Sequence, residues 1–406
     1  MRKTAQFVEK RRIVCYSIGK KSTIRENKMN YDVEVAVIGA GPAGSACGIT
    51  LQKAGITNIL IDKSRFPRNK TCGGLLTEKT YRVLTKTLLT DPVDGSDLGG
   101  VFCDVSERLD LYYGDERLSG SKVAKKLRSV RRVAFDDYLV KKYRSIGGML
   151  LEETAVDGID TENRALALSG GGTVKYRLLV VADGALSPTR RTLGFETPEL
   201  AFCTETYVPK ADLDIEERVV IDFGFVKNGY VWVFPSGDDY CIGLGGKSKK
   251  DRRYDDLLKE YLASLGADPD KYKMRGAFLP FGKPVDQRKG PDFAVLAGDA
   301  AGFVDQVTGE GIYFALSSGI AAGLSAAEAD FKKTYLEKVD PIAKAVKETD
   351  RFREKYLKNA PAALFRRVIG GRDAFTGFFC DNMISEMNYS YSNALEIYRG
   401  YKEGGK

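Results

Sequence analysis

The stretch 31–63, YDVEVAVIGAGPAGSACGITLQKAGITNILIDK, constrains the fold more than any other part of the chain. Residues 33–38 are almost wholly apolar, which is typical of a parallel strand that is buried on both faces. Glycines then follow at GxGxxG spacing, and the pattern predicts a helix over Pro42–Lys53 that ends at Gly55. A second apolar strand, Asn58–Ile61, completes a strand–turn–helix–strand unit.

The residue types in this unit suit the binding of a dinucleotide. Gly39 allows a tight turn, Gly41 lets the backbone approach a pyrophosphate, and Gly44 lets the helix pack closely on the strand. The helix N-terminus offers free N–H groups and a partial positive charge to phosphates. Asp62, eighteen residues after Gly44, is placed to accept hydrogen bonds from ribose hydroxyls. The unit therefore predicts dinucleotide binding.

Length and composition indicate a globular protein of two or three domains. The chain has 406 residues, of which 43% are hydrophobic and 29% charged, and it is long enough to bury a large core. Its net charge of +8 is concentrated in residues 1–28, which carry nine Lys and Arg against two Glu. Since the remainder is near neutral, we expect no nucleic-acid partner.

Residues 1–28 form a basic leader without a long apolar segment, so they do not resemble a secretory signal peptide. They weakly resemble an organelle transit peptide. We favour a disordered extension or a misassigned start codon, because Met29 stands directly before the first strand. The longest uncharged stretches, 35–52 and 311–327, are interrupted by glycines and other small residues, so no membrane span is predicted.

Cysteine and histidine usage narrows the possible chemistry. The seven cysteines are scattered without a CxxC pair, which predicts reduced thiols and a cytoplasmic location. Histidine is absent from the chain. This excludes a histidine general base and His-bearing zinc sites, and we expect no metal site. The chemistry must therefore come mostly from a cofactor.

The alternation of patterns predicts an α/β fold, α+β overall, in which a Rossmann-like domain receives a β-rich insertion twice. The Rossmann-like domain is expected at 29–90, 122–195 and 291–330, an antiparallel β-rich substrate-binding domain at 91–121 and 196–290, and a C-terminal helical region at 331–406. Within these pieces, the partly basic stretch 122–145 is predicted as a helix and 149–156 as one strand.

Two further acidic strand ends favour FAD over NAD. Asp183 begins a DGxxSxxR motif after a predicted strand, and Asp299 lies in a GD motif after another. An acidic side chain at such a position can hold the hydroxyls of a ribityl chain. Gly309 and Gly311 belong to a TGEG motif that opens a helix, whose N–H groups can face the electron-rich edge of an isoalloxazine ring. The sequence therefore predicts a Rossmann-like FAD-binding domain.

In this order and spacing, the motifs resemble those of the FAD-dependent family with the p-hydroxybenzoate hydroxylase fold, over roughly residues 31–327. Within that superfamily the chain is most similar to the geranylgeranyl reductase group. The closer resemblance depends on three motifs, FPRNKTCGG at 66–74, RVAFD at 132–136 and YVWVFP at 230–235. Gln306 stands where a proline is usual before TGEG, and Cys72 is followed by Gly-Gly-Leu, so the shape of the substrate pocket stays open.

The resemblance also implies roles for individual residues. Together with the motifs, it places at FAD the residues Gly39, Gly41, Ala43, Gly44, Asp62, Cys72, Gly73, Gly74, Arg132, Val156, Asp183, Asp299, Gly309, Gly311 and Ile312. Tyr230 and Trp232 are expected to line a prenyl tunnel, although Trp232 also suits an ordinary core position. Cys72, Tyr230 and Glu310 are candidates for proton donor, and Glu310 equally suits a role in orienting its helix.

By the same resemblance, the protein is expected to reduce carbon–carbon double bonds of a geranylgeranyl or other prenyl chain. NAD(P)H or ferredoxin would be the electron donor, and the substrate would bring the enzyme to the membrane surface as a peripheral protein. The alternatives are a flavin monooxygenase of a hydrophobic or aromatic substrate and an FAD or lipid carrier without turnover. A halogenase is disfavoured, because YxWxFP stands where WxWxIP would be expected.

Overall fold

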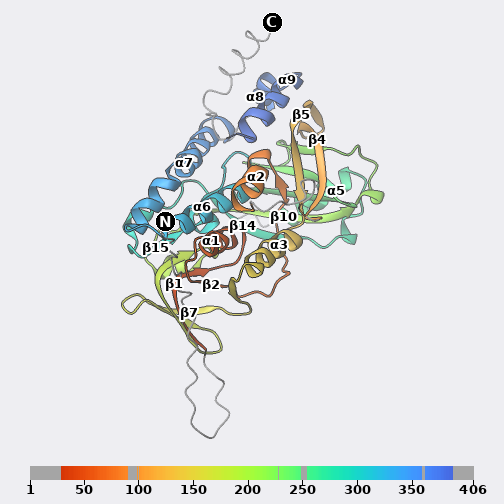
Figure 1. Ribbon diagram of the computed structural model, residues 1–406. Coiled ribbons are helices and arrows are strands. Elements are labelled where there is room, and N and C mark those ends of the chain that lie inside the picture. The colour runs from red at the N-terminus through yellow and green to blue at the C-terminus, as the bar shows by residue number, and fades with distance from the viewer. Residues whose placement is uncertain are drawn as a thin grey trace, which may run out of the picture.

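The computed structural model arranges the chain in two sheets with helices around them (Figure 1). It describes residues 29–89, 98, 100–226, 228–247, 254–358 and 362–386, so the predicted leader at 1–28 lies outside the described residues. The helices in these ranges are α1 (Pro42–Lys53), α2 (Glu78–Arg82), η1 (Val83–Leu88), α3 (Arg132–Ser145), α4 (Pro188–Thr192), η2 (Lys210–Asp212), α5 (Tyr254–Ser264), η3 (Pro269–Lys271), η4 (Gln287–Lys289), η5 (Gly298–Ala301), α6 (Ile312–Ser325), α7 (Phe331–Phe352), η6 (Arg353–Leu357), α8 (Ala362–Val368), α9 (Asp373–Phe378) and η7 (Phe379–Ile384). None of them is both long and apolar enough to cross a membrane.

The first sheet is the mostly parallel sheet that the glycine-rich unit predicts. Its strands are β1 (Asn30–Ile38), β2 (Asn58–Ile61), β6 (Met149–Leu151), β7 (Val156–Asp160), β8 (Ala165–Leu168), β9 (Thr173–Val181) and β15 (Ala294–Leu296), in the order β6-β2-β1-β9-β8-β7 with β15 also paired to β9. The strands β6, β2, β1, β9 and β15 run parallel. Their carboxyl ends therefore meet at one edge, where Gly39, Asp62, Asp183 and Asp299 follow.

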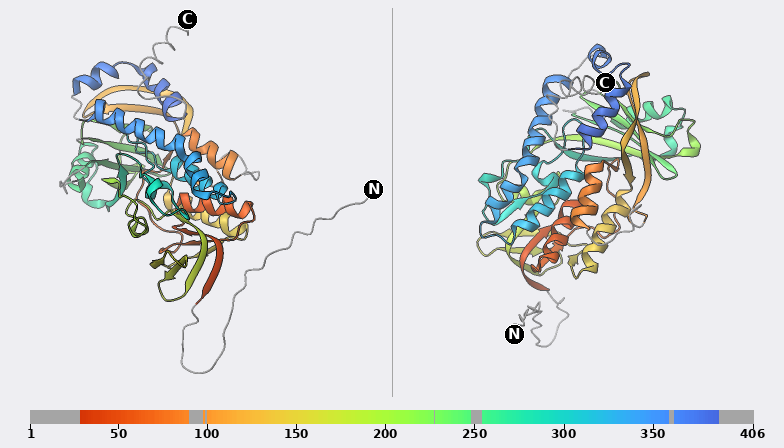
Figure 2. Two further views of the ribbon diagram at one scale, coloured as in Figure 1. Left: turned by 90° about the vertical axis from the view of Figure 1, so that its left-hand side faces the viewer. Right: turned by 45° about the horizontal axis from the view of Figure 1, so that its top comes forward.

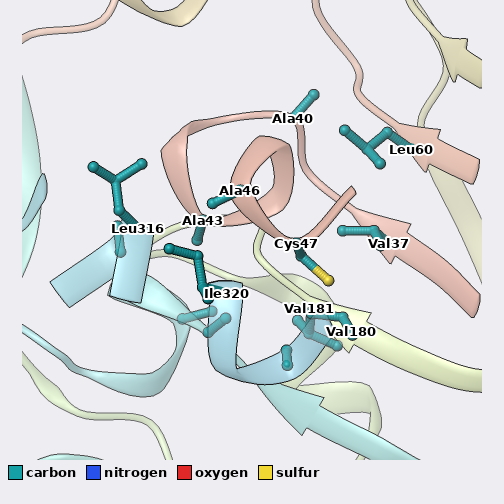
Figure 3. Packing of buried hydrophobic residues seen from close by; sticks show 14 of the residues in the cluster. Val37, Ala40, Ala43, Ala46, Cys47, Leu60, Val180, Val181, Leu316 and Ile320 are labelled. Carbon is teal, nitrogen blue, oxygen red and sulfur yellow. The ribbon is translucent and has the colours of Figure 1, made fainter. Parts of the chain in front are cut away.

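Small residues allow α1 and α6 to pack closely on each other. A Cβ atom on Gly319 of α6 would lie only 2.1 Å from the carbonyl oxygen of Ala43 in α1. Figure 3 shows Ala43 and Ala46 of α1 facing Leu316 and Ile320 of α6, within the core of the first sheet. This contact fixes α6, whose first residue is the predicted FAD contact Ile312.

The second sheet is mostly antiparallel, as the sequence predicts. Its strands are β3 (Leu75–Leu76), β4 (Phe102–Tyr113), β5 (Glu116–Val130), β10 (Glu199–Pro209), β11 (Val219–Asp222), β12 (Gly229–Ser236), β13 (Asp239–Gly246) and β14 (Arg275–Phe281), in the order β14-β10-β13-β12-β11-β4-β5-β3. One pair, β4 with β11, is parallel. The hairpin of β4 and β5 and the later strands β10 to β14 therefore form one sheet, and the pairing of β4 with β11 connects them.

The predicted helix over 122–145 is wrong in its first half. The structure continues β5 as far as Val130, and α3 begins only at Arg132. β5 pairs with β4 as an antiparallel hairpin, in which Val123 and Leu127 are buried while the lysines directly before them are exposed. This alternation is that of a strand, and cross-strand pairing outweighs the good helix propensity of the basic residues.

The predicted single strand over 149–156 is also wrong. The structure divides it into β6 and β7, which lie at opposite edges of the first sheet. The chain turns between them at Glu153, whose φ is +50°, in the left-handed region. Val156 therefore begins an edge strand instead of ending the predicted strand.

The C-terminal helices α8 and α9 lie beside β4 and β5 (Figures 1 and 2). The backbone N–H of Gly120 donates to Asp373 at 2.9 Å, and that of Lys125 donates to Asp381 at 2.7 Å. The Lys125 side chain also pairs with Glu386. The basic strand β5 thus binds acidic side chains of the C-terminal region and holds these helices against the second sheet.

Candidate cofactor and substrate site

A cavity of about 1560 Å³ lies between the two sheets and the C-terminal helices. The predicted site residues that line it are Gly39, Gly41, Ala43, Asp62, Cys72, Gly73, Gly74, Arg132, Asp183, Tyr230, Trp232, Asp299, Gly309, Glu310, Gly311 and Ile312. Gly44 and Val156 do not line it. Its volume exceeds the roughly 300–1,000 Å³ of a typical ligand pocket, which leaves room for a large cofactor and a second molecule.

The three glycines of the GxGxxG motif have different surroundings. Gly39 has a φ of +96°, and a Cβ atom there would lie 2.3 Å from the carbonyl oxygen of Ala182. A Cβ on Gly44 would lie 1.8 Å from the carbonyl oxygen of Gly39, which confirms that Gly44 serves the close packing of helix on strand. Gly41 instead faces the cavity, and a Cβ there would meet only Arg68, at 3.4 Å. Gly41 is therefore the position at which a ligand can approach the backbone.

Asp62 holds the glycine turn against the end of β2. Its two carboxylate oxygens accept hydrogen bonds from the backbone N–H groups of Ala40 and Ser64, each at 2.8 Å. Since a carboxylate oxygen can accept more than one hydrogen bond, the side chain retains capacity for a ligand hydroxyl. Its predicted contact with a ribose stays a prediction.

Arg132, at the start of α3, belongs to an ion-pair cluster in the cavity wall. Its guanidinium donates to both oxygens of Asp136, at 2.7 and 2.8 Å, and Arg68 pairs with the same carboxylate at 3.2 Å. Burial alone would lower the pKa of Arg132, but Asp136 raises it. Arg68 adds a positive charge beside Gly41. A role for Arg68 at the cofactor is not among the sequence-based predictions, although its place in the FPRNKTCGG motif was the available signal.

Asp183 and Asp299 reach the cavity from the ends of the neighbouring strands β9 and β15. Burial raises the pKa of both carboxyls, although Ser187 opposes it at Asp183 and Lys70 opposes it at Asp299. These residues fit FAD, because the open glycine turn with its nearby cation suits a pyrophosphate and the acidic strand ends suit hydroxyl groups.

The loop Cys72–Gly74 separates this polar part of the cavity from an apolar part. Gly73 packs so closely on aromatic rings that an added Cβ would lie 2.9 Å from Phe234 and 3.1 Å from Nε1 of Trp232. The Cys72 side chain lies beside the guanidinium of Arg132. Only a glycine at position 73 lets the loop pack this closely on the aromatic rings of β12.

A row of aromatic rings lines the apolar part of the cavity. Phe223 and Tyr230 lie 6.1 Å apart between ring centroids, Tyr230 and Trp232 also 6.1 Å, and Trp232 and Phe234 6.3 Å. The Tyr230 hydroxyl donates to the carbonyl oxygen of Thr308. Further apolar residues, Phe365, Ile369, Phe375, Phe379 and Ile384, complete the wall from the C-terminal helices. This contribution could not be predicted from the sequence, because contact with β5 determines it and no local pattern indicates it.

Glu310 is held in place by residues at the start of α2. Its Oε1 accepts hydrogen bonds from Thr77 and Thr80 at 2.7 and 2.9 Å, and its Oε2 pairs with Lys79 at 2.7 Å. Burial alone would lower the pKa of Lys79, but the charges of Glu310 and Asp305 raise it. This geometry favours the orienting role for Glu310, and its role in proton transfer stays a prediction.

Replacing Lys79 with Met should leave the Glu310 carboxylate buried without its cation. We expect the free energy of unfolding, measured by urea denaturation, to fall by about 3–5 kcal/mol. The double variant Lys79→Met/Glu310→Gln should recover most of this loss, because no uncompensated charge stays buried. A single variant as stable as the unsubstituted protein would contradict the ion pair.

Two sequence comparisons bear on this cavity. A family model described as an FAD binding domain matches residues 32–216. Menaquinone reductase of Mycobacterium tuberculosis is 32% identical over 310 residues, which cover 70% of this chain and 74% of the relative. Digeranylgeranylglycerophospholipid reductase of Methanococcus aeolicus is 27% identical over 358 residues, which cover 81% of this chain and 84% of the relative.

Among solved structures, a geranylgeranyl bacteriochlorophyll reductase-like protein from Thermoplasma acidophilum is similar with a TM-score of 0.74. The match covers 90% of this chain and 95% of that protein, at 17% sequence identity. At this identity, the likeness shows the shared fold alone. It agrees with the Rossmann-like FAD-binding fold that the first sheet and its glycine turn form.

Proposed function

Because the chain belongs to the geranylgeranyl reductase family of FAD-dependent oxidoreductases, we propose that it reduces carbon–carbon double bonds of a geranylgeranyl or related prenyl chain. The name of the relative from Methanococcus aeolicus includes two geranylgeranyl groups, which supports a substrate of this class. The name of the relative from Mycobacterium tuberculosis, menaquinone reductase, likewise supports a reductase that acts on a lipid-like substrate.

The observation that carries the proposal is the continuity of the cavity. Its polar part, around Gly41 and Asp299, has the donors and acceptors for FAD, and its apolar part is lined by aromatic and aliphatic side chains from three regions of the chain. The loop Cys72–Gly74 lies where the two parts meet. Burying a long hydrocarbon chain against such a wall stabilises the complex by about 25 cal/mol per Å² of apolar surface removed from water. A small polar substrate would gain little binding free energy there.

Bound FAD, once reduced, supplies a hydride to the substrate. An unconjugated alkene accepts hydride poorly, so stabilising positive charge at its more substituted carbon should accelerate the step. The ring faces of Tyr230 and Trp232 suit this task, since they attract a cation within about 6 Å. The candidate proton sources are the flavin itself, an ordered water, the Cys72 thiol, the Tyr230 hydroxyl and the Glu310 carboxyl. Of these, Glu310 is paired with Lys79 and the Tyr230 hydroxyl donates to Thr308.

The electron donor and the place of the reaction complete the proposal. NAD(P)H or ferredoxin would reduce the flavin, and a reductant protein would in the second case be a partner. A prenyl lipid would be drawn from a membrane, so the enzyme would act as a peripheral protein at the membrane surface.

The test is an anaerobic half-reaction. The FAD-loaded protein is reduced with dithionite, mixed with geranylgeranyl diphosphate or a geranylgeranyl lipid, and followed by the visible absorbance of oxidised flavin. We expect reoxidation by the unsaturated compound and none by its fully saturated analogue. Solved structures with this fold include a probable FAD-dependent monooxygenase, so a flavin that stays reduced until air enters would contradict the proposal.

A further inference from the structure

Glu205 is a buried carboxyl next to the loop Cys72–Gly74 that none of the roles above uses. It lies in β10, is 4% exposed, and its Oε1 accepts a hydrogen bond from the backbone N–H of Cys72 at 2.8 Å. Its Oε2 has no hydrogen-bond partner in the part of the chain that the structure describes. Because burial of a half-satisfied carboxylate is costly, its presence at this loop needs an explanation.

Charged and titratable groups from several elements surround this carboxyl. The cations that act on it are Lys70, two residues before the loop, Arg132 at the start of α3 and Arg275 at the start of β14. The neighbouring thiols and phenol are those of Cys203, Tyr207 and Cys241, from β10 and β13. Burial raises the pKa of Glu205 to about 7, although the Cys72 N–H and the three cations oppose it. The side chain therefore changes its charge near neutral pH.

The loop is fastened to the second sheet at two points. At one end, the carbonyl oxygen of Gly74 accepts a hydrogen bond from the backbone N–H of Val130 at 2.9 Å, a contact that does not titrate. At the other end, the Cys72 N–H donates to Glu205, and this contact does titrate. Gly73 lies between them, against Trp232. Of these two contacts, the one to Glu205 is thus the contact whose strength can change with pH.

We propose that Glu205 is a positioning residue for the loop Cys72–Gly74. The protonation state of Glu205 determines how firmly the loop is held, and therefore how well the protein retains FAD. When ionised, the carboxylate accepts a charge-assisted hydrogen bond from the Cys72 N–H and holds the loop in place. When protonated, it accepts only a weaker neutral hydrogen bond, and the loop loosens. The proposal concerns FAD binding without substrate, so it stands or falls separately from prenyl reduction.

The test measures the rate at which the FAD-loaded protein releases FAD, by the fluorescence of the free cofactor, between roughly pH 5.5 and 8.5. Release should be about fivefold faster on the acid side of a one-proton transition, because a neutral hydrogen bond is that much weaker than a charged one. The midpoint should lie near the pKa of Glu205, about 7. Glu205→Gln keeps the size of the side chain and an acceptor for the Cys72 N–H but cannot ionise. Its release rate should therefore be independent of pH.

Glu152→Gln is the matched control. Glu152 fastens the preceding segment by accepting a hydrogen bond from the backbone N–H of Phe66 at 2.8 Å. Burial alone would raise the pKa of Glu152, but Arg144 and this N–H lower it, so the variant should keep the transition near pH 7. A transition that persists in Glu205→Gln would belong to another carboxyl, such as Asp183 or Asp299, and would overturn the proposal. A release rate in the unsubstituted protein that does not change with pH would overturn it as well.

Discussion

Gly41→Val is expected to yield a folded protein that no longer retains FAD. The backbone at Gly41 has φ and ψ of −67° and −172°, which any residue adopts, and the nearest atom to an added Cβ is 3.4 Å away. The fold therefore tolerates the side chain. Its methyl groups, however, would occupy the space in which a pyrophosphate approaches the backbone N–H groups at the start of α1. We expect FAD affinity to fall by at least about 100-fold, since both the hydrogen bonds and the close approach are lost.

The measurement is the FAD content of the purified variant together with its thermal unfolding. Because a ligand that binds only the folded state stabilises it, the variant should unfold at the temperature of the FAD-depleted protein and not at that of the FAD-loaded one. Ala54→Val, at the exposed other end of α1, adds the same kind of bulk away from the cavity and should stay fully loaded. A yellow Gly41→Val protein with one FAD per chain would refute the assignment of this turn.

Trp232→Ala is expected to retain FAD and lose turnover. The Trp232 ring lies between Gly73 and Gly243, where added Cβ atoms would come within 3.1 and 2.3 Å of it, and it forms part of the cavity wall. A desolvated cation–π contact contributes about 2 kcal/mol, so its loss should slow substrate-dependent reoxidation of the flavin about 30-fold or more. The loop Cys72–Gly74 keeps its hydrogen bonds to Val130 and Glu205 in this variant, so FAD should be retained.

Trp232→Phe separates this effect from a general loss of packing. Replacing a buried Trp by Ala also costs about 3–5 kcal/mol of stability, whereas Phe keeps an aromatic face and most of the volume. We expect Trp232→Phe to reoxidise within about threefold of the unsubstituted protein, because a Phe ring face also attracts a cation. If the flavin of Trp232→Ala reoxidised at the rate of the unsubstituted protein, Trp232 would be a core residue without a role in turnover.

Local patterns were sufficient to predict the glycine-rich unit at the centre of the first sheet. The predicted helix Pro42–Lys53 and the predicted strand Asn58–Ile61 have the bounds that the structure gives to α1 and β2. Gly44 is recognisable because the atom closest to an added Cβ, the carbonyl oxygen of Gly39, belongs to the same short unit, whereas the atom closest to a Cβ on Gly39 belongs to the distant Ala182. The acidic side chains that follow β2, β9 and β15 lie at one edge because the carboxyl ends of parallel strands meet there.

Contacts between distant segments could not be predicted in the same way. The strand over 122–130 depends on its pairing with β4, and its lysines favour a helix when considered alone. Glu205 is 133 positions from Cys72 in the chain, so no local motif relates them. Gln306, a departure from the family pattern, is buried, and its side chain accepts from Gly282 N–H at 2.7 Å and donates to Val304 at 2.9 Å. Its amide thus joins the segment before TGEG to Gly282, a contact that the sequence alone does not indicate.

The mass of the product tests prenyl reduction most directly. The FAD-loaded protein, reduced by dithionite without oxygen, is incubated for a single turnover with a geranylgeranyl lipid, and the extracted lipid is analysed by mass spectrometry. Reduction of one double bond predicts a product heavier by two hydrogens, formed in proportion to the flavin reoxidised. An unchanged lipid under these conditions, followed by a product heavier by one oxygen after air is admitted, would contradict the reductase and identify a monooxygenase.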